Sequence, residues 1–225
     1  MLTRLLGLFL ALMQLGSGAL GAYGDEVSLG GRLFLVNRDY ALSADYVPDD
    51  LVRPDVKASS SAVLMRREAA GALEEMFAAA KAEGLSLVAV SGYRSYMTQK
   101  NIFARKVSKV GKQKALLYVA PPGTSEHQLG LAMDLGTNRS QSLNESFGST
   151  KEGQWVREHC HEFGFIIRYR EEWTEITGYA YEPWHVRYVG RPHAELIHEA
   201  DVPLEYYIRE LRSARYAQLT GEEMP

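Results

Sequence analysis

Three short segments concentrate histidine, carboxylate and arginine side chains in patterns that suit metal-assisted hydrolysis. They are S-G-Y-R-S at residues 91–95, S-E-H-Q-L-G-L-A-M-D at residues 125–134 and E-P-W-H at residues 182–185. A catalytic zinc ion takes three protein ligands and keeps a fourth position open for water. A matching set of two imidazoles and one carboxylate is offered by His127, Asp134 and His185.

The spacing of His127 and Asp134 restricts how the two residues can share one ion. Seven positions separate them. On one helix they would lie roughly 10 Å apart along the axis, too far for two bonds of about 2 Å to the same metal. On a straight strand an odd separation would put them on opposite faces. A shared ion therefore requires a bend between them, and Gly130 is the natural place for it.

The E-P-W-H segment suggests where the third ligand and a general base would lie. Pro183 pushes Glu182 into extended geometry, and the V-R-Y-V that follows favours a strand. His185 is therefore expected at a strand start, with Glu182 beside the water that zinc activates, where it would act as general base. Arg94 follows an apolar run and a glycine, a position suited to stabilising the oxyanion formed at a peptide carbonyl.

Each of these residues also has a purely structural interpretation. A histidine beside a glycine bend is more often a packing residue than a ligand, E-P-W-H is also a plausible turn around a packed indole, and Arg94 is able to pair with a surface acid. On spacing alone, H-x(6)-D is a weak motif. The remaining histidines offer no second set, because His159 and His161 face differently on a helix and His193 and His198 are expected to be surface or packing residues.

The elements that must position these residues mix helix and strand without a regular repeat. Apolar periodicity predicts strands at residues 33–36, 85–90, 130–135, 165–169 and 186–189, and helices at 61–83, 97–110, 112–119, 154–163 and 192–217. Without regular strand–helix–strand alternation, this order favours an α+β fold with a central, largely antiparallel sheet flanked by helices.

The N-terminus has the layout of a secretory signal peptide. Arg4 precedes an apolar run from Leu5 to Leu15, which is short for a membrane span, and small residues follow up to Ala22. We expect cleavage near Gly21 or Ala22 and export to the periplasm or the cell-wall surface, with a retained N-terminal anchor as the alternative. The predicted organisation is a signal peptide at 1–22, a flexible lead-in at 23–32, a single domain at 33–217 and a C-terminal tail at 218–225.

The bulk composition is that of an ordinary globular protein. Hydrophobic residues make up 46% and charged residues 24%, and the net charge of −3 gives no basic field for nucleic acid. Cys160 is the only cysteine, so an intramolecular disulfide is impossible and a small buried side chain is expected there. We expect a monomer.

The three segments resemble the motifs of VanY-type D-alanyl-D-alanine carboxypeptidases, which are related to VanX-type dipeptidases and to hedgehog domains. The similarity continues in order through G-F-I-I-R-Y, T-G-Y-A-Y-E-P-W-H-V-R-Y-V-G and L-E-Y-Y. The resemblance implies a hedgehog-like peptidase fold and one zinc ion held by His127, Asp134 and His185. It also implies that Glu182 is the catalytic base and that Arg94 stabilises the transition state.

The same resemblance suggests a substrate pocket. Ser125 and Gln99 fall where family members line the substrate pocket, and we expect them to help hold the terminal carboxylate of the peptide. Tyr93 and Trp184 are expected to wall that pocket, although the indole is equally suited to the core.

The implied activity is removal of a C-terminal D-alanine from peptidoglycan stem peptides, by a D,D- or an L,D-carboxypeptidase. The alternatives are a D,D-dipeptidase, an endopeptidase that cuts within the stem, and a non-catalytic peptidoglycan-binding protein on the same fold. Loss of Glu182 or Asp134 would have favoured the last, and both are present.

Overall fold

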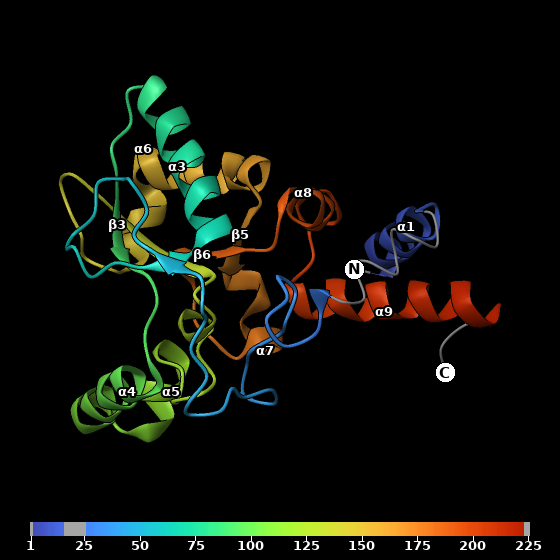
Figure 1. The fold of residues 1–225 in the computed structure, drawn as a ribbon, viewed down its shortest axis with the longest axis horizontal. Coiled ribbons are helices and arrows are strands. Elements are labelled where there is room, and N and C mark those ends of the chain that lie inside the picture. The colour runs from blue at the N-terminus through green and yellow to red at the C-terminus, as the bar shows by residue number, and fades with distance from the viewer. Residues whose placement is uncertain (1, 16–25, 223–225) are drawn as a thin grey trace.

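The computed structural model describes residues 2–15 and 26–222 (Figure 1). The signal-peptide cleavage site predicted near Gly21 or Ala22 lies outside these residues. The helices are α1 (Leu2–Met13), α3 (Arg67–Ala82), α4 (Tyr96–Val110), α5 (Lys112–Tyr118), α6 (Lys151–His159), α7 (Thr174–Thr177), α8 (Arg191–Ala200) and α9 (Leu204–Thr220). The strands are β1 (Leu51–Val52), β2 (Met65–Arg66), β3 (Leu87–Ser91), β4 (Ala132–Thr137), β5 (Phe165–Tyr169) and β6 (Glu182–Tyr188).

A four-stranded sheet forms the centre of the fold. Its strand order is β3-β4-β6-β5, and every neighbouring pair is antiparallel. The two inner strands, β4 and β6, are buried at every residue, as expected for strands covered on both faces. This arrangement confirms the α+β class and the antiparallel sheet predicted from the sequence.

Helices lie on two sides of the sheet. In Figure 1, α3 and α6 lie above the sheet, and α4, α5 and α7 lie below it. The apolar face of α3 repeats every three or four residues, and its Leu73, Met76 and Ala80 are buried in the main core. The helix ends before Gly84, which has a φ of 78°.

A second apolar cluster lies at the other end of the molecule. Figure 1 shows α1 and α9 side by side, extending away from the sheet. Leu5, Leu8 and Leu12 of α1 are buried in one cluster with Tyr207 and Leu211 of α9. The signal peptide at 1–22 stays a prediction. α9 ends at Thr220, within the predicted tail. Within the described residues, none of the helices is long and apolar enough to cross a membrane.

Three predicted elements differ from the structure. The helix predicted at residues 192–217 is two helices, α8 and α9, because residues 201–203 form a turn that contains Pro203. The strand predicted at residues 33–36 is wrong, because no strand forms there. Leu33 and Val36 are buried, but the carbonyl oxygens of Arg32 and Phe34 accept hydrogen bonds from the Arg187 side chain instead of from a neighbouring strand. The helix predicted from residue 61 begins at residue 67, since the two preceding residues pair with β1.

Candidate active site

His127 lies on a short 3-10 turn that ends in a left-handed glycine. The turn covers Glu126–Leu129, and Gly130 follows it with a φ of 69°, a conformation that favours glycine. The chain bends there into β4, which confirms the bend required by the spacing. Nδ1 of His127 lies 2.7 Å from the carbonyl oxygen of Gly92, so it carries the proton and donates it. Nε2 is then a free acceptor, and it is buried without a hydrogen-bond partner among the described residues.

Asp134 and His185 face each other on the two inner strands. They are direct register partners on β4 and β6, with 3.1 Å between Asp134 Oδ1 and His185 Nδ1. Asp134 Oδ2 lies 3.3 Å from Nε2 of His127. One ligand atom from each of the three residues lies within 4.8 Å of the others. Two imidazoles and a carboxylate, all buried, together with the unpartnered Nε2, fit a tetrahedral zinc site with bonds of about 2 Å.

The electrostatics of Asp134 and His127 suit a cation. Burial would raise the pKa of Asp134, but the two neighbouring histidines outweigh it and hold this pKa well below its usual range. Burial and the charge of Arg94 lower the pKa of His127 to about 4. Burial would also lower the pKa of His185, but hydrogen bonds to Asp134 and Glu126 raise it to about 9. The carboxylate is therefore ionised, and it attracts positive charge to the point between the histidines.

Glu182 opens β6 and faces the same pocket as His185. Ile167 pairs with Val186, and Tyr169 pairs with Glu182, so β6 carries extra residues between these pairs. Such a bulge changes the direction in which side chains point. Glu182 and His185, which an unbroken strand would place on opposite faces, therefore line the same pocket. Burial, and to a lesser extent the negative charge of Asp134, raise the pKa of Glu182 to about 8. A carboxyl group whose pKa lies near neutral pH is suited to take up and release a proton there.

Arg94 follows β3 and lines the same pocket. Its backbone N–H donates to the carbonyl oxygen of His127 over 3.2 Å, which fixes the residue beside the histidine turn. Nη2 lies 3.8 Å from Asp134 Oδ2, and Nε is buried with no hydrogen-bond partner among the described residues. The guanidinium thus has an unused donor near the three candidate ligands.

A narrow pocket of about 50 Å³ leads to these residues. It is lined by Arg94, Gln99, Tyr118, Val119, Ala120, Ser125, Glu126, His127, Tyr169, Tyr179, Glu182 and His185. Gln99 and Ser125 are both buried. Nε2 of Gln99 donates to the carbonyl oxygen of Ala120 over 2.7 Å, while its Oε1 has no partner in the described part of the chain.

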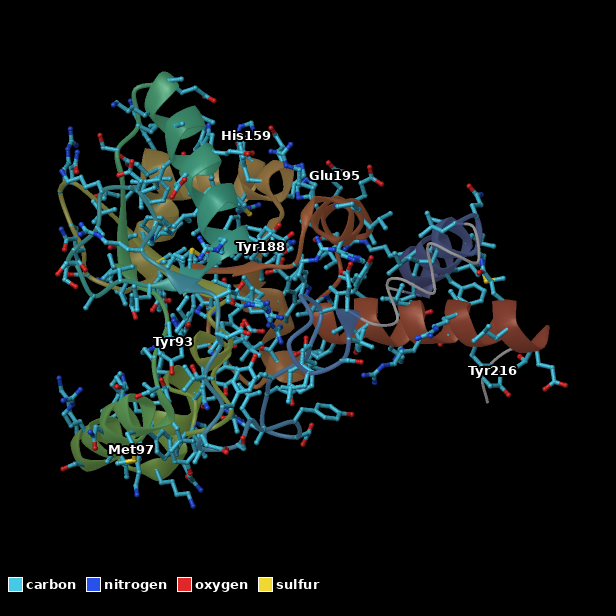
Figure 2. All side chains as sticks on the ribbon, in the orientation of Figure 1. Tyr93, Met97, His159, Tyr188, Glu195 and Tyr216 are labelled. Atoms are coloured by element: carbon cyan, nitrogen blue, oxygen red, sulfur yellow. The ribbon has the colours of Figure 1, made fainter. Side chains whose placement is uncertain are left out.

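Two residues predicted to wall the pocket do not line it. Trp184 belongs to the main hydrophobic core, the alternative left open for this indole. Tyr93 is partly exposed, and its backbone N–H donates to the Leu64 carbonyl oxygen. Figure 2 shows it between the sheet and the α4–α5 pair.

Three tyrosines and an acid in this pocket were not predicted from the sequence. Tyr118 ends α5, Tyr169 ends β5, Tyr179 lies just before β6, and Glu126 lies beside His127. The signal for Glu126 was its place inside the histidine motif. Burial would raise the pKa of Glu126, but the charges of Arg168 and Arg187 outweigh it and hold this pKa well below its usual range.

The other histidines lie away from the pocket. Nδ1 of His159 lies 2.7 Å from a carboxylate oxygen of Glu162, and His161 stacks on His198 with ring centroids 3.6 Å apart. His193 is buried. In the part of the chain that the structure describes, the only cluster of three or more metal-ligating side chains is the one formed by His127 with Asp134 and His185.

Comparison with known proteins places this site in a family. Residues 62–191 match the model of the VanY family, described as D-alanyl-D-alanine carboxypeptidase. The chain is 51% identical over 185 residues to the putative carboxypeptidase YodJ of Bacillus subtilis, covering 80% of this chain and 68% of that protein. It is 33% identical over 194 residues to a D-alanyl-D-alanine carboxypeptidase of Enterococcus faecium, covering 82% of this chain and 60% of that protein.

Solved structures agree in fold. The L,D-carboxypeptidase LdcB matches with a TM-score of 0.74 and 51% identity, over 78% of this chain and 85% of that one. A vancomycin-resistance D,D-pentapeptidase VanY, solved with Zn(II), matches with a TM-score of 0.67 and 35% identity, over 79% of this chain and 98% of that one. The chain belongs to the VanY family of D-alanyl-D-alanine carboxypeptidases.

Proposed function

We propose that this protein is a zinc-dependent carboxypeptidase that removes the C-terminal D-alanine of peptidoglycan stem peptides. One observation carries the proposal. His127, Asp134 and His185 offer ligand atoms within 4.8 Å of one another, with Nε2 of His127 and Nδ1 of His185 both facing the Asp134 carboxylate. Glu182 and Arg94 line the pocket beside them. The zinc found in the related VanY structure supports the choice of metal.

The residues of the pocket divide the chemistry between them. A bound zinc ion supplies a Lewis acid that lowers the pKa of water to about 7. Glu182 takes a proton from the attacking water and then gives it to the leaving amine. Arg94 stabilises the negative charge that develops on the carbonyl oxygen of the scissile bond. Burial of the site excludes bulk water and strengthens both interactions.

The small pocket suits a small terminal residue. Its volume of about 50 Å³ favours a small end group over a long side chain. Gln99 and Ser125 lie in the pocket wall, and we propose that they bind the terminal carboxylate of the substrate. The Ser125 hydroxyl is one donor for such a carboxylate, and the Gln99 amide has a second N–H besides the one that it gives to the Ala120 carbonyl oxygen.

We further propose that the preferred substrate is the tetrapeptide stem, in which the residue before the scissile bond is linked through an L-configured centre. Support comes from LdcB, which is 51% identical to this chain and is an L,D-carboxypeptidase. The D,D-pentapeptidase VanY is 35% identical.

Muropeptide mass spectrometry tests the proposal. Zinc-loaded protein is incubated with tetrapeptide and pentapeptide stems side by side, with and without a chelator. We expect one alanine to be lost from the tetrapeptide and the loss to stop with chelator. Loss of alanine from the pentapeptide alone would overturn the L,D assignment but would agree with a peptidase. Binding without any cleavage would overturn the enzyme and favour a non-catalytic cell-wall protein.

We also propose that the protein works outside the cytoplasm, in the periplasm or at the cell-wall surface. Support comes from the N-terminal residues 1–22, which have the charge and apolar layout of a signal peptide. The intact mass of the protein recovered from the cell envelope measures this directly. The mass of a chain that begins near residue 22 agrees with a cleaved leader, and the mass of the full-length chain indicates a retained anchor.

A further inference from the structure

A buried ionic cluster lies behind His185, on the side away from Asp134. It contains Glu126, Arg168 and Arg187, whose side chains are at most 1% exposed. Arg168 Nε and Arg187 Nη1 both donate to Glu126 Oε1, over 2.8 Å and 2.9 Å. Three charges without contact with water are costly unless each is paired and hydrogen-bonded.

Every side-chain nitrogen of Arg168 and Arg187 donates at least one hydrogen bond. Arg168 donates its two terminal nitrogens to Glu205 in the first turn of α9, over 3.0 Å and 2.5 Å. Arg187 donates to the carbonyl oxygens of Arg32 and Phe34 over 2.7 Å and 3.0 Å, and its Nε donates to the carbonyl oxygen of Tyr188. The cluster thus joins β5, β6, α9 and the segment around Phe34. Its position is fixed from several sides.

The second oxygen of Glu126 faces the metal ligand. Oε2 lies 3.3 Å from Nε2 of His185, while Nδ1 of the same ring lies 3.1 Å from Asp134. An imidazole that carries its proton on Nε2 presents a lone pair at Nδ1. Histidine ligands are usually held in this way by a carboxylate on their other nitrogen.

We infer that Glu126 is a positioning residue for the metal site. It accepts the Nε2 proton of His185 and so keeps Nδ1 of that ring free and aimed at the metal. Arg168 and Arg187 hold the carboxylate in place. This inference rests on the zinc site of the proposed function.

Replacement of Glu126 by glutamine would present a hydrogen-bond donor to His185 in place of an acceptor. The two arginines would keep the amide oxygen, because they are donors only. The NH₂ group would then face Nε2 of His185 and favour the tautomer that carries its proton on Nδ1. A protonated Nδ1 has no lone pair with which to bind the metal. E126Q is therefore expected to weaken zinc binding 10- to 100-fold.

Glu205 supplies the matched control. E205Q also removes one carboxylate charge from Arg168, but Glu205 makes no hydrogen bond to His185. If the cluster only stabilises the fold, both variants lose stability and behave alike toward zinc. If Glu126 orients the ligand, only E126Q loses zinc affinity.

The experiment measures zinc affinity by competition with a chromophoric chelator, and the melting temperature of each metal-free protein. We expect a lower melting temperature in both variants, unchanged zinc affinity in E205Q and the 10- to 100-fold loss in E126Q. Folded E126Q with wild-type affinity, or equal losses in the two variants, would overturn the inference. A wild-type protein that binds no zinc overturns the proposed function itself, before any variant is compared.

A measurement on the wild-type chain covers the case in which E126Q does not fold. In zinc-loaded protein labelled with ¹⁵N-histidine, we expect the His185 proton on Nε2 and zinc on Nδ1. Zinc on Nε2, or a proton on Nδ1, would overturn the inference.

Discussion

A methyl group added at Gly92 tests the geometry of the metal site. The Cβ of an alanine there would lie 2.2 Å from the carbonyl oxygen of Leu64 and 3.1 Å from Cε of Met133. Carbon–oxygen contacts normally lie near 3.3–3.6 Å, so the backbone must move by about 1 Å. The Gly92 carbonyl oxygen holds Nδ1 of His127 at 2.7 Å, so the histidine moves as well. A misplacement of about 1 Å lowers kcat/KM by about 100-fold, and overpacking costs about 1–3 kcal/mol of stability.

Gly71 is the control for this substitution. It lies on the exposed face of α3, and an added Cβ would meet no atom within 4 Å. Gly71→Ala should therefore raise stability by about 0.5–1 kcal/mol with unchanged kcat/KM. The assay is D-alanine release at a temperature where both variants are fully folded, together with zinc affinity. Wild-type turnover and zinc binding in Gly92→Ala would refute the assignment of this carbonyl as the support of His127.

Three further predictions concern Arg94, the zinc ion and Cys160. Arg94→Ala should lower kcat by about 10²–10³ while the protein still binds zinc. An unchanged kcat in the zinc-loaded variant, measured by steady-state kinetics, would contradict this. Zinc at 100 times its Kd should stabilise the fold by about 2.7 kcal/mol, seen as a higher melting temperature that chelator reverses. Burial raises the pKa of the Cys160 thiol to about 12, above its unfolded value near 8.5. Native protein should therefore resist thiol reagents at pH 8, and stability should fall as pH rises above about 8.5; rapid labelling of folded protein would contradict the burial.

The local features of the site were predictable because each follows from chain geometry. A shared ion required a bend between His127 and Asp134, and the structure has a left-handed glycine there. Pro183 favoured an extended Glu182, which opens β6. Four of the five predicted strands were confirmed, since their apolar runs are buried.

Contacts between distant segments were harder to predict. The bulge in β6 depends on how β5 pairs with it, and no local pattern near Glu182 reveals that register. Trp184 and Tyr93 were expected in the pocket wall from motif position alone, but Trp184 packs in the main core and neither residue lines the pocket. The ionic cluster had one neglected signal. Arg168 and Arg187 interrupt apolar strands, and a buried arginine requires an acidic partner.

The central claim is that Glu182 activates water at a zinc site, and the most direct test measures zinc content and D-alanine release in Glu182→Ala. Glu182 is not one of the three candidate ligands. We therefore predict one zinc per chain, with turnover reduced by about 10²–10⁴ through loss of the general base. Normal turnover in a zinc-loaded Glu182→Ala protein would contradict the account.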